Sequence, residues 1–211
     1  MLSAVRVIHG VGYTAVAAAL CPILWSAYDI RLCAIREFGA VIHEFDPYFN
    51  YRASEYLAAN GWAAFFSWFD HMSWYPLGRP VGTTIYPGPQ IVAVGIWRGL
   101  GAIVAAAGQP SWSLVEVCCY TPAWFGVLAT AFAGLLAAEC AGSTAAGVSA
   151  AFVMAILPAH AQRSVGGGFD NESVAIAPMC AAFYFWCRSL RGPTSWPFAA
   201  LAGLASACKA P

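Results

Sequence analysis

Long apolar segments separated by short polar turns dominate the second half of the chain. They predict helices at residues 117–138, 145–157 (extendable to residue 160), 174–187 and 196–207. Several of these segments are shorter than the ~20 residues that a lone membrane span needs. Because close packing of helices rich in Ala and Gly tolerates short spans, the pattern still predicts a bundle of transmembrane helices.

A further apolar segment, residues 11–27, lies near the N-terminus. A cleaved signal peptide is one interpretation, but its apolar region is usually about 7–15 residues long and ends in small residues. This segment is longer, contains Cys21 and Pro22, and is closed by the bulky Trp25 and Tyr28. We therefore expect a retained first span.

The chain between the first span and the later helices is more polar. Residues 31–98 hold ten charged side chains, whereas residues 99–162 hold two. In residues 56–70, aromatic and small side chains alternate at helical spacing and predict an amphipathic helix lying against the bundle. Residues 83–107 are apolar but are interrupted by Pro, Gly and Arg98, which favours a broken, interfacial or re-entrant element over a clean span.

These patterns divide the chain into three parts and predict an all-α polytopic membrane protein. We expect a first transmembrane span in residues 1–30 and a long polar loop with short amphipathic and interfacial helices in residues 31–115. Helical transmembrane spans are expected in residues 116–211, with an acidic loop near residues 161–172.

Composition strengthens the membrane assignment. Hydrophobic residues make up 60% of the 211 residues and charged residues 9%, with a mean hydropathy of +0.64. Ordinary soluble domains contain about 25% charged residues. Nucleic-acid binding, disorder and a coiled coil each need charge that this chain lacks, so we expect membrane lipid and no nucleic acid around it.

Two acidic clusters lie next to predicted spans. The first contains Glu44 and Asp46 and follows the first span. The second contains Asp170 and Glu172 and follows Arg163 and three glycines. Carboxylates beside apolar spans are costly to place and are functional candidates by default. Taken singly, each cluster could instead cap a helix or contact lipid headgroups.

The number of membrane crossings between the clusters decides whether they can share a site. If residues 83–107 do not cross, both clusters lie on the same side, and if they do cross, the clusters face opposite compartments. The broken composition of that segment favours the first count. Asp46, Asp170 and Glu172 would then supply three hard oxygen ligands, which suit Mg²⁺ or Mn²⁺ better than Zn²⁺.

The chain closely resembles the catalytic subunit of the eukaryotic oligosaccharyltransferase in HEFDPYFNYRASEYLAANGW, WYPLGR and RSVGGGFDNE. The resemblance is almost continuous over residues 36–98 and resumes over residues 158–187. It implies the N-terminal part of a GT-C type glycosyltransferase membrane bundle with a long first lumenal loop. It also implies a multi-pass protein of the endoplasmic reticulum membrane, with the acidic motifs on the lumenal side.

The reaction implied by this resemblance is protein N-glycosylation. An oligosaccharide is transferred from dolichol pyrophosphate to the Asn of Asn-x-Ser/Thr sequons. The expected partners are the lipid-linked oligosaccharide donor, a nascent acceptor polypeptide and other oligosaccharyltransferase subunits. The expected cofactor is Mn²⁺ or Mg²⁺.

The resemblance also implies roles for individual residues. Asp46 matches the acidic residue that binds the metal and faces the acceptor asparagine, and Glu44 completes that first acidic motif. Asp170 and Glu172 match the second acidic motif, also at the metal. Arg163 matches an arginine important for activity, so Asp46 and Arg163 are the expected catalytic residues.

Three other residues leave alternatives open. Arg52 and Arg79 could bind the pyrophosphate of the donor, although ion pairs within the loop are the favoured interpretation. Ser173 stands where the family commonly has Gly, and it creates a sequon at Asn171. A glycan on Asn171 would obstruct the predicted metal site.

The sequence ends at Pro211, within or just after the segment that matches the family's fifth span. We therefore expect an incomplete portion of the enzyme that is inactive alone. A truncated non-catalytic assembly partner or pseudoenzyme is the alternative. An ion-coupled transporter is disfavoured, because the acidic residues lie mainly outside the predicted spans and no internal repeat is evident.

Overall fold

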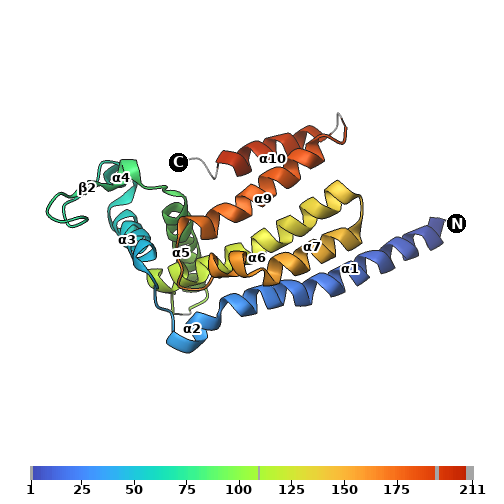
Figure 1. The fold of residues 1–211 in the computed structure, drawn as a ribbon, viewed down its shortest axis with the longest axis horizontal. Coiled ribbons are helices and arrows are strands. Elements are labelled where there is room, and N and C mark those ends of the chain that lie inside the picture. The colour runs from blue at the N-terminus through green and yellow to red at the C-terminus, as the bar shows by residue number, and fades with distance from the viewer. Residues whose placement is uncertain (1, 109, 193–194, 208–211) are drawn as a thin grey trace.

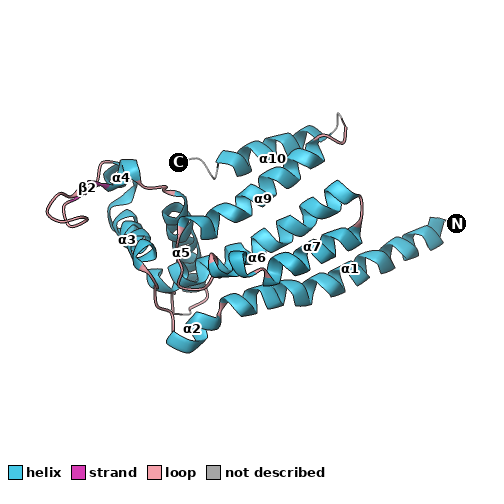
Figure 2. Ribbon diagram, viewed as in Figure 1, coloured by secondary structure: helices cyan, strands magenta, loops and turns pink. Residues whose placement is uncertain are grey.

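The structure, a computed structural model, describes residues 2–108, 110–192 and 195–207. Most of this chain is helical, and loops and two very short strands connect the helices (Figure 2). The helices are α1 (Leu2–Arg31), α2 (Cys33–Phe38), α3 (Phe45–Phe66), α4 (Val81–Thr84), α5 (Gly88–Ala106), α6 (Leu114–Ala141), α7 (Thr144–Ile156), α8 (Pro158–Gln162), α9 (Asn171–Ser189) and α10 (Trp196–Ala207). The strands are β1 (Phe69–Asp70) and β2 (Arg79–Pro80).

The long helices α1, α6, α7, α9 and α10 lie side by side in a bundle, in which α6 contacts α1, α7 and α9 (Figure 1). Small residues allow α6 and α7 to approach closely. A Cβ added at Gly147 would lie 2.7 Å from the Cβ of Ala138 and 2.8 Å from the carbonyl oxygen of Gly134. Such contacts are typical of helices that pack within membranes.

A smaller lobe caps one end of the bundle. Helices α3 and α5 run across the direction of the long helices, and the β1–β2 hairpin projects beyond them (Figure 1). A hydrophobic core containing Leu57, Phe65, Val81 and Val94 holds the lobe together. The opposite end of the bundle carries the α6–α7 and α9–α10 connections.

Local signals explain where the central helix begins and ends. Ser113 and Glu116 form a reciprocal capping box at the start of α6, which satisfies backbone N–H groups that the first helical turn leaves free. The helix ends at Gly142, whose φ of 62° lies in the left-handed region that favours glycine. Ser143 then caps α7 by accepting a hydrogen bond from the Ala146 amide.

The four helices predicted after residue 116 are confirmed as α6, α7, α9 and α10. Within the described residues, Gly88–Ala106 and Leu114–Ala141 are long and apolar enough to cross a membrane, judged by length and composition. Helices α7 and α10 are apolar but shorter.

The structure bears on two predictions for the polar loop: the break predicted in residues 83–107 is present, and the bounds predicted for the 56–70 helix were wrong. Residues 83–107 are interrupted only between α4 and α5, and α5 is continuous from Gly88. Pro89 lies in the first turn, where the missing N–H breaks no hydrogen bond. The helix predicted at 56–70 instead runs from residue 45 to 66 and kinks at Gly61, after which Phe69 and Asp70 pair with β2.

Candidate functional site

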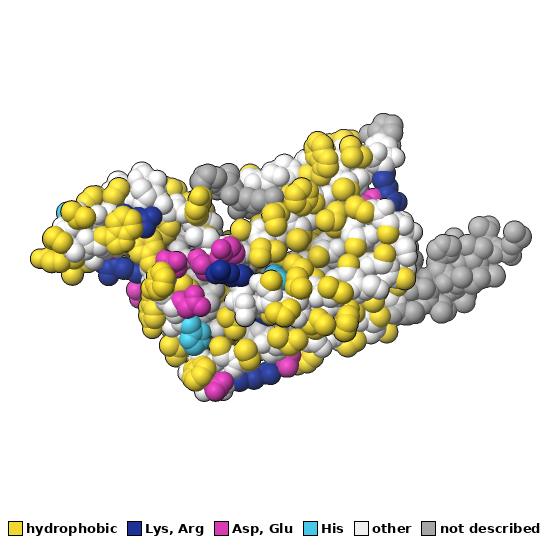
Figure 3. Space-filling model, in the orientation of Figure 1, with side chains coloured by type: hydrophobic (Ala, Val, Ile, Leu, Met, Phe, Trp, Pro, Cys, Tyr) yellow, Lys and Arg dark blue, Asp and Glu magenta, His cyan; other side chains and the backbone are white. Residues whose placement is uncertain are grey.

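The two acidic segments meet at the end of the bundle that carries the lobe. The backbone N–H of His43, just before the first cluster, donates to the carbonyl oxygen of Gly167, just before the second, over 3.0 Å. On this face, acidic side chains gather around a basic one where the lobe joins the bundle (Figure 3). The packing therefore places both acidic segments side by side at the same end of the bundle.

The glycine loop before the second cluster is tied to two helices. Gly166 N–H donates to the Arg31 carbonyl (2.7 Å), and Gly167 N–H donates to the Cys119 carbonyl (2.9 Å). Gly167 has a φ of 89°, and a Cβ there would lie 2.4 Å from the Val41 carbonyl oxygen. Only glycine fits this close approach.

Arg31 anchors the same loop with its fully buried side chain. Its Nε donates to Ser164 Oγ over 2.8 Å, and its Nη1 donates to the carbonyls of Ala27 and Ala155. A planar guanidinium is suited to bridging several acceptors at fixed angles. The end of α1 is thus joined to α7 and to the loop that precedes Asp170.

Asp46 and Asp170 lie at helix N-termini. Asp46 is in the first turn of α3, and Asp170 caps α9 by accepting a hydrogen bond from the Asn171 amide over 2.7 Å. Both residues line a cavity of about 210 Å³, together with Arg79 and Tyr86. The positive end of each helix dipole favours negative charge here, on the carboxylates themselves or on a ligand.

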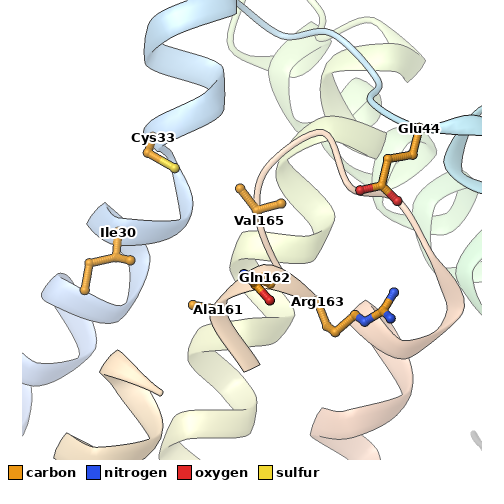
Figure 4. A pocket seen from close by; sticks show the side chains of 7 residues that line it. All are labelled: Ile30, Cys33, Glu44, Ala161, Gln162, Arg163 and Val165. Carbon is orange, nitrogen blue, oxygen red and sulfur yellow. The ribbon is translucent and has the colours of Figure 1, made fainter. Parts of the chain in front are cut away.

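Glu172, Glu44 and Arg163 face a different region. Arg163 Nη1 lies 4.0 Å from Glu172 Oε2, and both side chains are more than half exposed. Arg163 and Glu44 line a second cavity of about 580 Å³ beside the end of α1. Their side chains extend toward one another from separate chain segments (Figure 4).

The two carboxylates of each acidic motif therefore lie in different regions of the site. Asp46 and Asp170 come together in the smaller cavity, whereas Glu44 and Glu172 lie outside its lining. Glu44 differs from Asp46 because it precedes α3 with a φ of 66°. Residues two positions apart at a helix N-terminus do not share a face, which separates Glu172 from Asp170.

The donor set of the smaller cavity fits a hard divalent cation in part. Asp46 and Asp170 supply carboxylate oxygens, and Asn171 Oδ1 is buried without a hydrogen-bond partner among the described residues. Oxygen donors of this kind suit Mg²⁺ or Mn²⁺. Within the described chain, however, no three His, Cys, Asp or Glu side chains form a ready metal-binding group.

The two arginines of the polar loop occupy different environments. Arg52 forms a bidentate ion pair with buried Asp70, with hydrogen bonds of 2.7 and 2.9 Å. These hydrogen bonds, with others from Met72 N–H and Ser73 Oγ, hold the pKa of Asp70 well below its ordinary value. Arg52 therefore stabilises the hairpin.

Arg79, by contrast, faces the smaller cavity. Its guanidinium donates to the hydroxyl and carbonyl of Thr84 and lies against the rings of Phe49 and Trp74. These contacts hold a cation in the same cavity as Asp46 and Asp170, and among the residues that the structure describes no carboxylate forms an ion pair with it. An anionic ligand could use that charge.

The sequon at Asn171 is locked into the start of α9. The Ser173 hydroxyl donates to the Asp170 carbonyl over 2.5 Å, and Ser173 is only 1% exposed. The serine of the sequon is therefore buried and already hydrogen-bonded within the first turn of α9.

Sequence reasoning missed Arg31 and Asn50 as parts of this site. Arg31 is one of the ten charges in residues 31–98, and because an arginine near the end of an apolar helix usually extends to the membrane interface, the sequence alone gives no signal for its burial. Asn50 lies in α3 and donates from Nδ2 to Asp170 Oδ1 over 3.2 Å. Its position four residues after Asp46 places it on the same helix face.

Comparison with known proteins gives consistent matches. The family model described as "Oligosaccharyl transferase STT3, N-terminal" matches residues 13–207. The dolichyl-diphosphooligosaccharide–protein glycosyltransferase subunit STT3A of Oryza sativa subsp. japonica is 41% identical over 164 residues, which cover 78% of this chain and 20% of the relative. Subunit STT3 of Saccharomyces cerevisiae is 40% identical over 168 residues, covering 79% and 23%.

Subunit STT3 of Dictyostelium discoideum is 39% identical over 180 residues, which cover 85% of this chain and 24% of the relative. The chain thus spans a quarter or less of the length of these relatives. The match over residues 13–207 includes both acidic segments, the greater part of α1 and all of α6, α7, α9 and α10. The chain therefore belongs to the oligosaccharyl transferase STT3 family.

Proposed function

We propose that this chain is the N-terminal membrane part of a GT-C type oligosaccharyltransferase subunit. The subunit transfers an oligosaccharide from dolichyl diphosphate to Asn in Asn-x-Ser/Thr sequons at the lumenal face of the endoplasmic reticulum membrane. One observation carries the proposal: in a chain of this family, Asp46 and Asp170 line the same cavity at one end of the helical bundle.

The acceptor asparagine presents the main chemical difficulty. Its amide nitrogen is a poor nucleophile because the lone pair is delocalised into the carbonyl. Asp46 is exposed at the cavity and can accept hydrogen bonds from the acceptor N–H groups. Holding those N–H groups favours a twisted amide, at a cost that binding of the rest of the sequon offsets.

The donor leaves as a pyrophosphate, and the site offers positive charge for it. Asp46 and Asp170 would hold the divalent cation, with the unpaired Asn171 Oδ1 as a further oxygen donor. Bound Mn²⁺ or Mg²⁺ supplies charge that stabilises the leaving pyrophosphate. Glu172 was also predicted as a metal ligand, but it does not line the smaller cavity and lies beside Arg163 instead.

The arginines extend this role. Arg163 lies at the border between the larger cavity and Glu172 and would steady an anionic donor. Arg79 faces the smaller cavity, where it can bind a phosphate oxygen. The partners of the working enzyme would be the lipid-linked donor, the acceptor polypeptide and the other subunits of the complex.

The test is substitution of Asp46 in the full-length protein that contains this sequence. Asp46→Ala should lower glycosylation of reporter sequons by at least about 100-fold, as expected when a group acting on the transition state is removed. Asp29→Ala is the matched control, because Asp29 is a partly exposed carboxylate that pairs with Arg36 and lines neither the smaller nor the larger cavity. Unchanged reporter occupancy in a membrane-inserted Asp46→Ala protein would refute the proposal.

A further inference from the structure

Two buried amides connect α5, α3 and the second acidic segment. Asn50 in α3 is 2% exposed, and its Nδ2 donates to the Phe169 carbonyl and to Asp170 Oδ1, both over 3.2 Å. Gln90 in α5 is fully buried, and its Nε2 donates to Asn50 Oδ1 over 3.0 Å. The three side chains form a continuous relay that ends at the carboxylate.

The hydrogen bonds to Asp170 converge on one oxygen. Oδ1 accepts from both Asn50 Nδ2 and the Asn171 amide. Because the carboxylate is planar, two donors on Oδ1 fix the direction in which Oδ2 points. Asp170 also lines the smaller cavity, so the oxygen that these donors do not use is left for a ligand there.

The relay also determines which way the Asn50 amide faces. Asn carries a donor and an acceptor that exchange places when the amide rotates by half a turn. With Gln90 donating to Oδ1, the Nδ2 group of Asn50 faces Asp170. The reversed amide would set an oxygen against Asp170 Oδ1 and would lose both hydrogen bonds to the second acidic segment.

We propose that Asn50 is a positioning residue that holds Asp170 Oδ2 toward the divalent cation of the smaller cavity, with Gln90 fixing the orientation of the Asn50 amide. This role rests on the proposed function. Groups that orient a metal ligand without touching the metal typically change metal affinity by about 10–100-fold when removed. Asn50 therefore sets the metal affinity of the site.

The test compares three variants of the full-length protein in its complex. Asn50→Leu replaces the amide by an apolar side chain of similar shape, and Gln90→Met does the same one step further from Asp170. Asn60→Leu is the matched control, because Asn60 lies in the same helix, is exposed, and within the described part of the chain donates to the Tyr56 carbonyl of its own helix and to no residue of the site. Two quantities are measured: Mn²⁺ binding to the purified protein by electron paramagnetic resonance, and the Mn²⁺ concentration that gives half-maximal glycosylation.

Asn50→Leu should weaken Mn²⁺ binding and raise the half-maximal concentration by about tenfold, with most of the rate recovered at saturating Mn²⁺. Gln90→Met should give a smaller rise, about threefold, because it removes one neutral hydrogen bond. Asn60→Leu should match the wild type. A purely structural role would lower the rate at every Mn²⁺ concentration without changing Mn²⁺ affinity, and that result would overturn the proposal.

If Asn50→Leu fails to accumulate in membranes, Gln90→Met decides the question, and wild-type Mn²⁺ affinity in that variant refutes the relay. Asp46→Ala and Asp170→Asn in the same assays distinguish a failure of the positioning role of Asn50 from a failure of the proposed function. If these two variants lose Mn²⁺ binding while Asn50→Leu keeps it, only the positioning role fails. If they keep Mn²⁺ binding and glycosylation as well, the proposed function fails with it.

Discussion

At the scale of single residues, Arg31 is an unusual element of the site. It is fully buried, and among the described residues no carboxylate pairs with it. Its donors reach Ser164 and two helix carbonyls instead. A buried cation without a counter-ion carries a desolvation cost, so its contribution is better understood as fixing the position of the glycine loop than as stabilising the whole fold.

Arg31→Met should therefore loosen the loop more than it changes thermal stability. Loss of the charged hydrogen bond to Ser164 should lower the local opening free energy by about 1.5–3 kcal/mol, which is roughly a tenfold or greater rise in exchange. Amide hydrogen exchange at Gly166 and Gly167 measures this directly. Arg36→Met is the control, since Arg36 forms an exposed ion pair near the same helix end. Equal exchange in both variants would contradict the anchoring role.

At the scale of elements, the connection between the acidic segments depends on one glycine. Gly167 and Gly142 both have positive φ, of 89° and 62°. A Cβ at Gly142 would meet nothing within 4 Å, whereas at Gly167 it would meet the Val41 carbonyl and the His43 ring. The two positions thus share a backbone requirement but differ in available space.

Gly142→Ala should cost only the strain of a left-handed residue, about 1–2 kcal/mol, and leave glycosylation near wild type. Gly167→Ala should in addition displace residues 41–43 and separate Asp46 from Asp170. Because misplacing a catalytic group by about 1 Å can cost roughly 100-fold in rate, this variant should lower glycosylation by more than about tenfold. Reporter glycosylation and thermal unfolding of both variants provide the comparison. Equal activity in the two variants would show that the close approach at Gly167 is dispensable.

Much of this element-level organisation could be predicted from the sequence, because long apolar segments and polar turns mark α6, α7, α9 and α10 directly. The continuity of α5 could not, since Pro89 disrupts a helix interior but is harmless in a first turn. The acidic clusters were identified, but the divergence of Asp170 and Glu172 depends on helical phase. The partners of Asn50 and Arg31 depend on tertiary packing between distant segments.

At the scale of the whole molecule, the orientation of α5 determines which surfaces share a compartment. By length and composition α5 could cross a membrane, yet it runs across the direction of α1, α6, α7 and α9 at one end of the bundle (Figure 1). If α6 and the helices packed along it cross the membrane, as proposed, a helix that runs across their direction would lie along the membrane surface rather than through it. α6, with 28 residues and about 42 Å of length, is long enough to cross the ~30 Å hydrocarbon core.

This arrangement predicts the sidedness of three exposed positions. Leu77 at the hairpin and Gln162 beside the larger cavity lie at the end that carries the acidic segments, whereas Leu190 lies in the connection at the opposite end. In sealed microsomes, epitope tags inserted at Leu77 and Gln162 should both be protected from added protease, and a tag at Leu190 should be removed. If α5 crossed the membrane, the Leu77 and Gln162 tags would differ in protection. Asp46 and Asp170 would then face different compartments, and no cation could bind both.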